Sequence, residues 1–315
     1  MSMRQPYPNF LARLTALGLV LLGLLLFGCV QQEPSCVERQ GPQLPKNSWP
    51  QKLKIGLVPE QDIFTQKKRY EPLLAQLAEK IGVPIEIKIL PSYSHVLDQF
   101  REFDLDGAFF GSYTGTMAIS QLGVEPLVRP QFTDDNATSY AIVFTKKGAA
   151  GIRTARDMRG KRLVLVDKES STGYLLPMAY LRSLGIGDTD DWFGSVFFSG
   201  THADAVRDVL NGYADIGAVS STIFFMLAET DPRVLNELTV LATSIQIPSN
   251  PFAVRDGLPG DLKQTLRQQL LALHQSAAGR VILDDLKVKQ FTEATKEDYQ
   301  PLLELISHAQ QHQPN

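Results

Sequence analysis

Three hydroxyl side chains, Ser170, Ser171 and Thr172, stand in a row immediately before a glycine. The apolar run Leu163 to Val166 predicts a strand before them, and the run Gly173 to Leu184 predicts a helix after them. Hydroxyls at a helix N-terminus lie beside free backbone N–H groups and the positive end of the helix dipole. One capping hydroxyl would satisfy the helix alone. The two additional hydroxyls therefore favour a compact anion site without a formal positive charge.

Three further candidates also stand where a predicted strand gives way to a turn or helix. Tyr93 lies in the stretch Pro91 to His95, Tyr140 begins a later strand, and His202 follows Gly200 and Thr201 at the start of a helix. A tyrosine provides an apolar wall and one O–H donor. A histidine in the first turn of a helix can donate to an anion, and the helix dipole favours its neutral form.

Short apolar strands and amphipathic helices must position these side chains. The first predicted group consists of strands Lys54 to Val58, Ile85 to Ile89 and Leu105 to Phe110, with helices Pro72 to Ile81 and Ser94 to Glu102. The second consists of strands Tyr140 to Thr145, Leu163 to Val166, Ser195 to Phe198 and Ile216 to Val219, with helices Gly173 to Leu184 and His202 to Leu210. Alternating strands and helices predict an α/β fold with parallel strands joined by crossovers.

Two such groups predict a two-lobed clamshell in which each lobe is a mostly parallel sheet flanked by helices. We assign residues 53–145 and 245–315 to lobe 1 and residues 146–244 to lobe 2, with two hinge crossings, the first at Lys146-Lys147-Gly148. Ligands of open α/β sheets bind beyond the carboxyl ends of the strands. We therefore expect the site in the cleft between the lobes, where hinge closure can bury a small solute.

The N-terminal 28 residues predict a lipoprotein signal peptide. Arg4 and Arg13 supply the positive region, and the leucine-rich run Leu14 to Phe27 is shorter than the roughly 20 residues of a membrane span. The following Gly28-Cys29 resembles a bacterial lipobox, which implies lipidation at Cys29 and export to a membrane surface that faces the periplasm or the cell exterior. Residues 29–51 read as a polar tether. Val30 leans toward the outer membrane, and we assign no role to Cys36.

Composition excludes several classes of partner. The formal net charge is −3, and it becomes −5 when residues 1–28 with their two arginines are removed. A mildly acidic chain without a basic stripe argues against nucleic acid as a partner. Two cysteines, one of them in the lipobox, allow no disulfide framework. Only His308 and His312 have a helical metal-ligand spacing, and they lie in a polar tail, so we expect no metal and no cofactor.

An ordered set of motifs is similar to the phosphate, phosphite and phosphonate-binding proteins of ABC importers. The matching stretches are Tyr70-Glu71-Pro72-Leu73, Tyr93, Gly111-Ser112, Tyr140, Ser170-Ser171-Thr172-Gly173, Ser199-Gly200-Thr201-His202 and Gly212 to Ala218. The resemblance covers roughly Leu53 to Arg255 and implies a type II periplasmic-binding-protein clamshell. It also implies an ABC permease as partner, and we expect a monomer.

The resemblance assigns roles to individual residues. Ser170, Ser171 and Thr172 would hold the phosphonate oxygens, with His202 beside them. Tyr93 and Tyr140 would close over the group. Ser112 and Asn250 are further candidate donors to the ligand.

Two departures from the family narrow the expected ligand. Members that take aminoalkyl phosphonates place carboxylates near the ammonium, whereas this chain has Ile223 and Asn250 at the corresponding places. A buried ammonium without a countercharge is costly. We therefore expect phosphite, phosphate, methylphosphonate or a similar small oxyanion without an amine.

Other functions fit the sequence less well or are left open by it. An enzyme that uses Ser170 or Ser171 as nucleophile with His202 as base lacks the Gly-x-Ser-x-Gly elbow. A cationic ligand lacks a carboxylate pair or an aromatic cage. Two alternatives stay open at this point: a sulfonate ligand, since hydroxyls and helix dipoles serve both anions, and a sensory lipoprotein that docks on a signalling partner.

Overall fold

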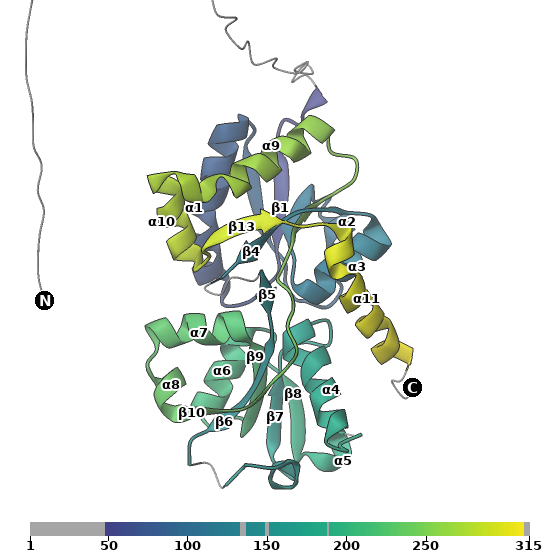
Figure 1. The fold of residues 1–315 in the computed structure, drawn as a ribbon, viewed down its shortest axis with the longest axis vertical. Coiled ribbons are helices and arrows are strands. Elements are labelled where there is room, and N and C mark those ends of the chain that lie inside the picture. The colour runs from purple at the N-terminus through teal and green to yellow at the C-terminus, as the bar shows by residue number, and fades with distance from the viewer. Residues whose placement is uncertain (1–47, 133–136, 149–150, 188, 312–315) are drawn as a thin grey trace, which may run out of the picture. The chain divides into compact units, whose positions relative to one another are not determined.

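The computed structural model describes residues 48–132, 137–148, 151–187 and 189–311 (Figure 1). The segment Leu44–Asn315 forms one compact unit that contains every element described below. The predicted signal peptide, Cys29, Cys36 and most of the tether lie outside the described residues.

The first sheet has six strands in the order β13-β4-β12-β3-β1-β2. Its strands are β1 (Leu53–Leu57), β2 (Ile85–Ile89), β3 (Gly107–Phe109), β4 (Glu125–Gln131), β12 (Phe252–Val254) and β13 (Gln290–Glu293). Its helices are α1 (Ile63–Ile81), α2 (Val96–Glu102), α3 (Ser112–Leu122), α9 (Gly260–Leu271), α10 (Ala277–Leu286) and α11 (Lys296–Gln311), with a short turn at Leu273–Gln275. β1 pairs parallel with β2 and β3, whereas β12 pairs antiparallel with β3 and β4, and β13 antiparallel with β4.

The second sheet has five strands in the order β10-β6-β9-β7-β8. Its strands are β6 (Ala141–Lys146), β7 (Arg162–Leu165), β8 (Ser195–Phe198), β9 (Ile216–Ser220) and β10 (Leu238–Thr243). Its helical segments are Ala155–Met158, the π-helical turn Ser171–Leu175, α4 (Leu176–Ser183), α5 (Thr189–Trp192), α6 (His202–Leu210), α7 (Ser221–Thr230) and α8 (Arg233–Glu237). β8, β7 and β9 are parallel, and β6 pairs antiparallel with β9 on one side and with β10 on the other.

Both sheets are therefore mixed, but most strands of each run in one direction, as predicted: only β12 and β13 are reversed in the first sheet and only β6 in the second. The antiparallel strands are those formed as the chain enters or leaves a sheet, and periodicity alone does not report their direction.

A two-stranded ribbon of β5 (Thr138–Ser139) and β11 (Ile247–Pro248) marks the two passages of the chain between the sheets (Figure 1). The predicted first crossing at Lys146 is displaced from this ribbon. β6 pairs with β9 and β10 along its whole length, so it belongs to the second sheet and the chain crosses before Ala141.

Helix α1 begins nine residues earlier than the predicted start at Pro72. Asp62 caps the helix by accepting a 2.9 Å hydrogen bond from the backbone N–H of Thr65. Pro72 then lies inside the helix, although proline removes one helical hydrogen bond. The buried side chains Leu73, Leu74 and Leu77 anchor this half of the helix against the first sheet and offset that loss.

The C-terminal helix α11 packs against elements from both sides of the crossing ribbon. Leu302 and Ile306 share an apolar cluster with Ile247 of the ribbon and with Leu175 and Leu176 of the turn before α4. The helix therefore supports the turn that carries the three hydroxyl side chains.

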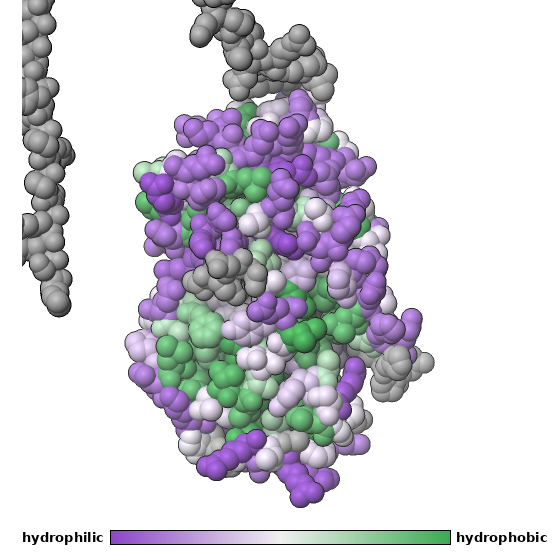
Figure 2. Space-filling model, in the orientation of Figure 1, coloured by the Kyte–Doolittle hydropathy of each residue, from purple (hydrophilic) through white to green (hydrophobic). Residues whose placement is uncertain are grey.

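Hydrophobic surface gathers over the elements of the second sheet, whereas the elements of the first sheet show a largely hydrophilic surface in the same view (Figure 2). Exposed apolar side chains of the second group include Phe225, Leu235 and Val240. Within the described residues, the helices are too short or too polar to cross a membrane.

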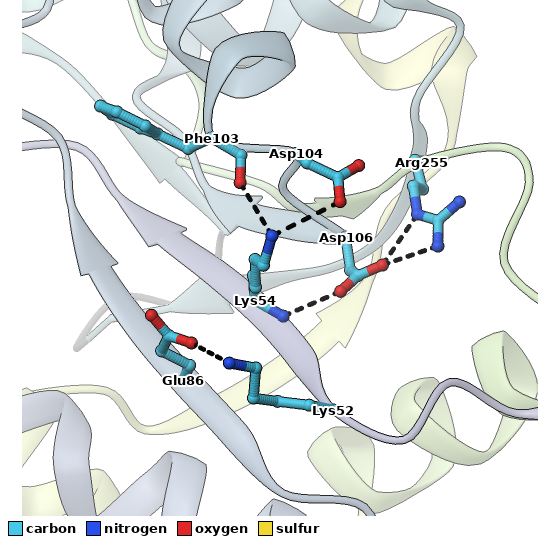
Figure 3. Close-up of polar contacts among 7 residues, drawn as sticks. All are labelled: Lys52, Lys54, Glu86, Phe103, Asp104, Asp106 and Arg255. Atoms are coloured by element: carbon cyan, nitrogen blue, oxygen red, sulfur yellow. Dashed lines mark hydrogen bonds and ion pairs between the residues drawn. The ribbon is translucent and has the colours of Figure 1, made fainter.

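Asp106 joins three strands of the first sheet through a single buried carboxylate (Figure 3). Its Oδ2 accepts a 2.8 Å hydrogen bond from the backbone N–H of Lys54 in β1. Its Oδ1 accepts 2.8 Å bonds from the guanidinium of Arg255, which follows β12. The carboxylate itself precedes β3, so it fixes the ends of three adjacent strands. In contrast, the ion pair of Lys52 with Glu86 in the same view is exposed.

We expect Asp106→Ala to lower the free energy of unfolding by about 2 kcal/mol, because it leaves a buried backbone N–H without an acceptor. Urea denaturation of the variant and the parent measures this change. Lys52→Ala is the matched control on the neighbouring strand end, and it should cost clearly less because exposed pairs contribute little. Equal losses in the two variants would contradict this role for Asp106.

Candidate anion-binding site

A small cavity lies where the carboxyl ends of the central strands of both sheets meet. Its lining residues come from turns after β1, β2 and β3 of the first sheet and after β7, β8 and β9 of the second, with one residue from the return passage. They are Glu60, Tyr93, Gly111, Ser112, Tyr113, Glu169, Ser170, Ser171, Thr172, His202, Ser220 and Asn250. The space between its walls is about 250 Å³ and is partly open to solvent, so it suits only a small solute.

The turn after β7 presents the three predicted hydroxyl side chains, all of them buried. Ser170 caps the π-helical turn, because its Oγ accepts a 3.0 Å hydrogen bond from the backbone N–H of Gly173. Gly173 is required by packing: a Cβ atom there would lie 2.5 Å from the side chain of Val166. The turn can therefore pack directly on the end of β7 and point its hydroxyls into the cavity.

Ser171 carries the clearest mark of a binding site. Its Oγ is buried and has no hydrogen-bond partner among the described residues. An unsatisfied buried hydroxyl costs free energy unless another molecule completes its bonding. Because the residue lines the cavity, an acceptor placed in the cavity would restore that bond.

His202 offers one defined donor to the cavity. Thr201 caps α6 by accepting a hydrogen bond from the backbone N–H of Asp204, which places His202 in the first turn. The Nδ1 atom of His202 accepts a 3.1 Å hydrogen bond from the backbone N–H of Ser220, and burial lowers the pKa of the imidazole to about 3. The ring is therefore neutral with its proton on Nε2, which leaves an N–H donor without a positive charge.

Tyr93 lies edge-on to His202, with ring centroids 6.0 Å apart. Burial, together with the negative charge of Glu60, raises the pKa of the Tyr93 hydroxyl well above its usual range. The hydroxyl therefore keeps its proton and can act as a donor.

Ser112 and Asn250 line the cavity, but their polar atoms are largely engaged with each other and with the protein. The hydroxyl of Ser112 lies 2.8 Å from the carbonyl oxygen of Pro248 and 3.0 Å from Oδ1 of Asn250. Nδ2 of Asn250 donates a 2.6 Å hydrogen bond to Oε1 of Glu60. These contacts indicate that the two residues position the wall of the cavity, whereas the sequence suggested them as direct donors.

Tyr140 does not line this cavity. It lies immediately before β6 and contributes to a wider opening with Thr138, Ser221 and Phe225. The family resemblance suggested Tyr140 as a residue that closes over the ligand, whereas here it lies at the neighbouring opening.

Glu60 and Glu169 are cavity residues that the sequence interpretation missed. Burial raises the pKa of the Glu60 carboxyl, although the positive charge of Arg69 and the hydrogen bond from Asn250 act in the opposite direction. Burial likewise raises the pKa of Glu169, against the hydrogen bond from the backbone of His95. Their positions in the sequence could have pointed to the cavity, since Glu60 closely follows the first strand and Glu169 directly precedes Ser170.

The arrangement can hold an anion through neutral donors. No Lys or Arg is among the described residues that line the cavity. Helices α3 and α6 begin at its wall, so their free N–H groups and positive dipole ends face it. Among the residues that the structure describes, no cluster of three or more His, Cys, Asp or Glu side chains is placed to hold a metal ion.

Comparison with known proteins places this geometry in a family. The family model described as "ABC transporter, phosphonate, periplasmic substrate-binding protein" matches residues 55–299. A probable ABC transporter phosphite binding protein, PhnD1 of Prochlorococcus marinus (strain MIT 9301), is 21% identical over 271 residues, which are 83% of this chain and 91% of that protein. The phosphate-import protein PhnD of Mycolicibacterium smegmatis is 24% identical over 228 residues, or 70% and 71% of the two chains.

The solved structure of PhnD1 from Prochlorococcus marinus in complex with methylphosphonate is similar, with a TM-score of 0.74 at 20% identity. The match covers 82% of this chain and 98% of that chain. This likeness confirms the predicted type II periplasmic-binding-protein fold.

We expect His202 to make the protein less stable as the pH falls. The unfolded chain protonates this imidazole near its ordinary pKa of about 6.5, whereas the folded chain resists protonation down to a pKa of about 3. Stability is therefore lost between these two values, at about 1.4 kcal/mol per pH unit. Between pH 7 and pH 5, the parent should lose about 2 kcal/mol more than His202→Asn. The asparagine retains an acceptor for the Ser220 N–H.

Urea denaturation of the parent and the variant at both pH values tests this prediction. Equal losses of stability in the two proteins would contradict it.

Proposed function

Because the chain belongs to the phosphonate family of periplasmic substrate-binding proteins of ABC transporters, we propose that it captures a small phosphorus oxyanion for import. The ligand is phosphite, phosphate or a small phosphonate without an amine. Of the relatives named above, one is described as a phosphite binding protein and one as a phosphate-import protein, and the solved structure of PhnD1 is a complex with methylphosphonate. Because the family consists of exported binding proteins that deliver solute to a permease, the chain is a binding protein and not an enzyme.

The partnerless hydroxyl of Ser171 is the observation that carries this proposal. It lies in one cavity with Ser170, Thr172 and the Nε2–H of His202. Each hydrogen bond to a charged group contributes about 1.5–3 kcal/mol. Several together can offset the desolvation of a buried oxyanion.

The walls next to the cavity support a ligand without an amine. Glu60 and Asn250 also line a second, mostly apolar pocket that contains Ile223 and Arg69. A substituent on phosphorus would extend into that pocket, where the guanidinium of Arg69 would repel an ammonium. Glu60 lines both pockets, and its Oε1 accepts a hydrogen bond from Asn250.

Contacts between elements of the two sheets support hinge closure as the mode of capture. Oγ of Ser94 lies 2.9 Å from Oδ2 of Asp167, and Nζ of Lys287 lies 2.7 Å from Oε2 of Glu229. These polar contacts join elements of the first sheet to elements of the second, and they can form only when the two groups of elements approach each other. A ligand bonded to both walls would shift the population toward this closed arrangement.

The anchoring part of the proposal concerns the N-terminus. We infer from Gly28-Cys29 and the preceding apolar run that the mature chain is a lipoprotein attached to a bacterial membrane through Cys29. The polar segment that follows would serve as its tether.

Titration calorimetry with a panel of anions tests the ligand class. Methylphosphonate, phosphite and phosphate should include at least one ligand that binds in the micromolar range or tighter. 2-Aminoethylphosphonate should bind at least about tenfold more weakly than methylphosphonate, because the guanidinium of Arg69 would repel its ammonium in the adjoining pocket. Tighter binding of the aminophosphonate would overturn the assignment of an amine-free ligand. Absence of binding by the whole panel would overturn the proposed function.

Ser171→Ala should separate affinity from stability. Loss of one charge-assisted hydrogen bond should weaken methylphosphonate binding by about ten- to a hundredfold. The same change removes an unsatisfied buried hydroxyl, so the melting temperature of the unliganded protein should stay the same or rise. Ser170→Ala is the control, because it removes a helix cap and should lower the melting temperature. A drop in melting temperature for Ser171→Ala with unchanged affinity would show that this hydroxyl has a structural role.

A further inference from the structure

Glu60 is held at the cavity by contacts on every side of the residue. Its backbone N–H donates to Oε1 of Gln66 at 3.1 Å, and its carbonyl oxygen accepts from the N–H of Ala203 at 3.3 Å. Its Oε1 accepts the 2.6 Å hydrogen bond from Asn250, whose Oδ1 in turn contacts Ser112. The side chain is therefore fixed at the wall of the cavity.

The Glu60 carboxylate accepts hydrogen bonds, whereas the groups around it can donate them. The hydroxyls of Ser170, Ser171 and Thr172 and the Nε2–H of His202 can all donate. An ionised carboxylate can only accept, and Asn250 is the donor that the structure describes for it. Within the described residues, this leaves Oε2 of Glu60 for a donor that enters the cavity.

Glu169 also lines the cavity, but its carboxylate already accepts a hydrogen bond from the backbone of His95. It joins the wall that carries Ser170 to the turn before α2. Glu60 is thus the better placed acceptor for a bound molecule.

Phosphorus and sulfur oxyanions differ in what they can offer such an acceptor. Phosphoryl groups lose their last proton near neutral pH, with a pKa of about 6 for phosphorylated side chains. A phosphonate, phosphite or phosphate can therefore bind with one P–OH donor, because the proton is readily taken up near neutral pH. A sulfonate or sulfate is fully ionised and has no O–H.

We propose that Glu60 selects the ligand by accepting a hydrogen bond from its P–OH group, so that the cavity takes protonated phosphorus oxyanions and rejects sulfonates and sulfate. This inference rests on the proposed function of the same cavity and decides between its two anion classes. A sulfonate would meet the negative charge of Glu60 at close range, or Glu60 would first have to take a proton from solvent. A buried polar group that is left without its partner rejects an otherwise isosteric ligand strongly.

The test compares methylphosphonate with methanesulfonate, two ligands of the same shape, by titration calorimetry at pH 7 on the full chain. The parent should prefer methylphosphonate by at least about a hundredfold. Glu60→Gln keeps the oxygen that Asn250 contacts and replaces the acceptor with an amide N–H. This variant should reduce the preference by about tenfold or more, as methanesulfonate gains affinity and methylphosphonate loses it.

Asp62→Asn is the matched control, because it removes the same charge two residues away. Asp62 caps α1 and does not line the cavity, and asparagine can also cap a helix. Its preference should stay within about twofold of the parent, as expected for an exposed charge. Thermal unfolding of each variant verifies that it is folded.

Two results would overturn the inference while the proposed function stands. In one, Glu60→Gln changes the affinities for both ligands by the same factor, which would make Glu60 a general negative charge. In the other, neither affinity changes. If the parent binds methanesulfonate and no phosphorus oxyanion, the proposed function fails as well.

Discussion

An oxyanion that leaves water must find enough hydrogen-bond donors to replace its hydration shell, and this constraint explains the arrangement of the molecule. The proposed site would meet it without a lysine or arginine among the described residues at the cavity. Donors come instead from places where a strand ends and a helix begins, since such turns expose backbone N–H groups and capping hydroxyls together. Parallel strands bring several of these turns to one edge of a sheet. Two sheets whose carboxyl edges face each other double the number of such turns, so a site between them has twice as many donors within reach.

The parts of the site that could be predicted from sequence are those coded locally. Ser170, Ser171 and Thr172 are contiguous, and His202 follows a capping threonine, so a short window reveals both the turn and its donors. The sheet that β6 joins could not be predicted in this way, because its strand pairing is decided by contacts about 75 residues along the chain with β9 and 95 with β10. The reversed direction of β6, β12 and β13 escaped for the same reason.

Glu60 shows a different limit of sequence reasoning. A search for an anion site selects donors and discards carboxylates, so the rule that found Ser170 also passed over the acid at the end of β1. The significance of Glu60 depends on its neighbours, because Asn250, 190 positions later, holds one oxygen of its carboxylate at the wall of the cavity. The arrangement of one acceptor among many donors arises only when distant segments of the chain come together in the folded cavity.

The neutrality of the donor set has a consequence for the kinetics of capture. Charged clefts speed the arrival of oppositely charged solutes by long-range attraction, which salt then screens. This cavity has no such attraction to lose, and the chain as a whole carries a formal charge of −3. Encounter with an anion therefore proceeds by unassisted diffusion, and dissolved salt can only relieve a weak repulsion. A binder built in this way collects its solute at nearly the same rate in fresh and in saline surroundings.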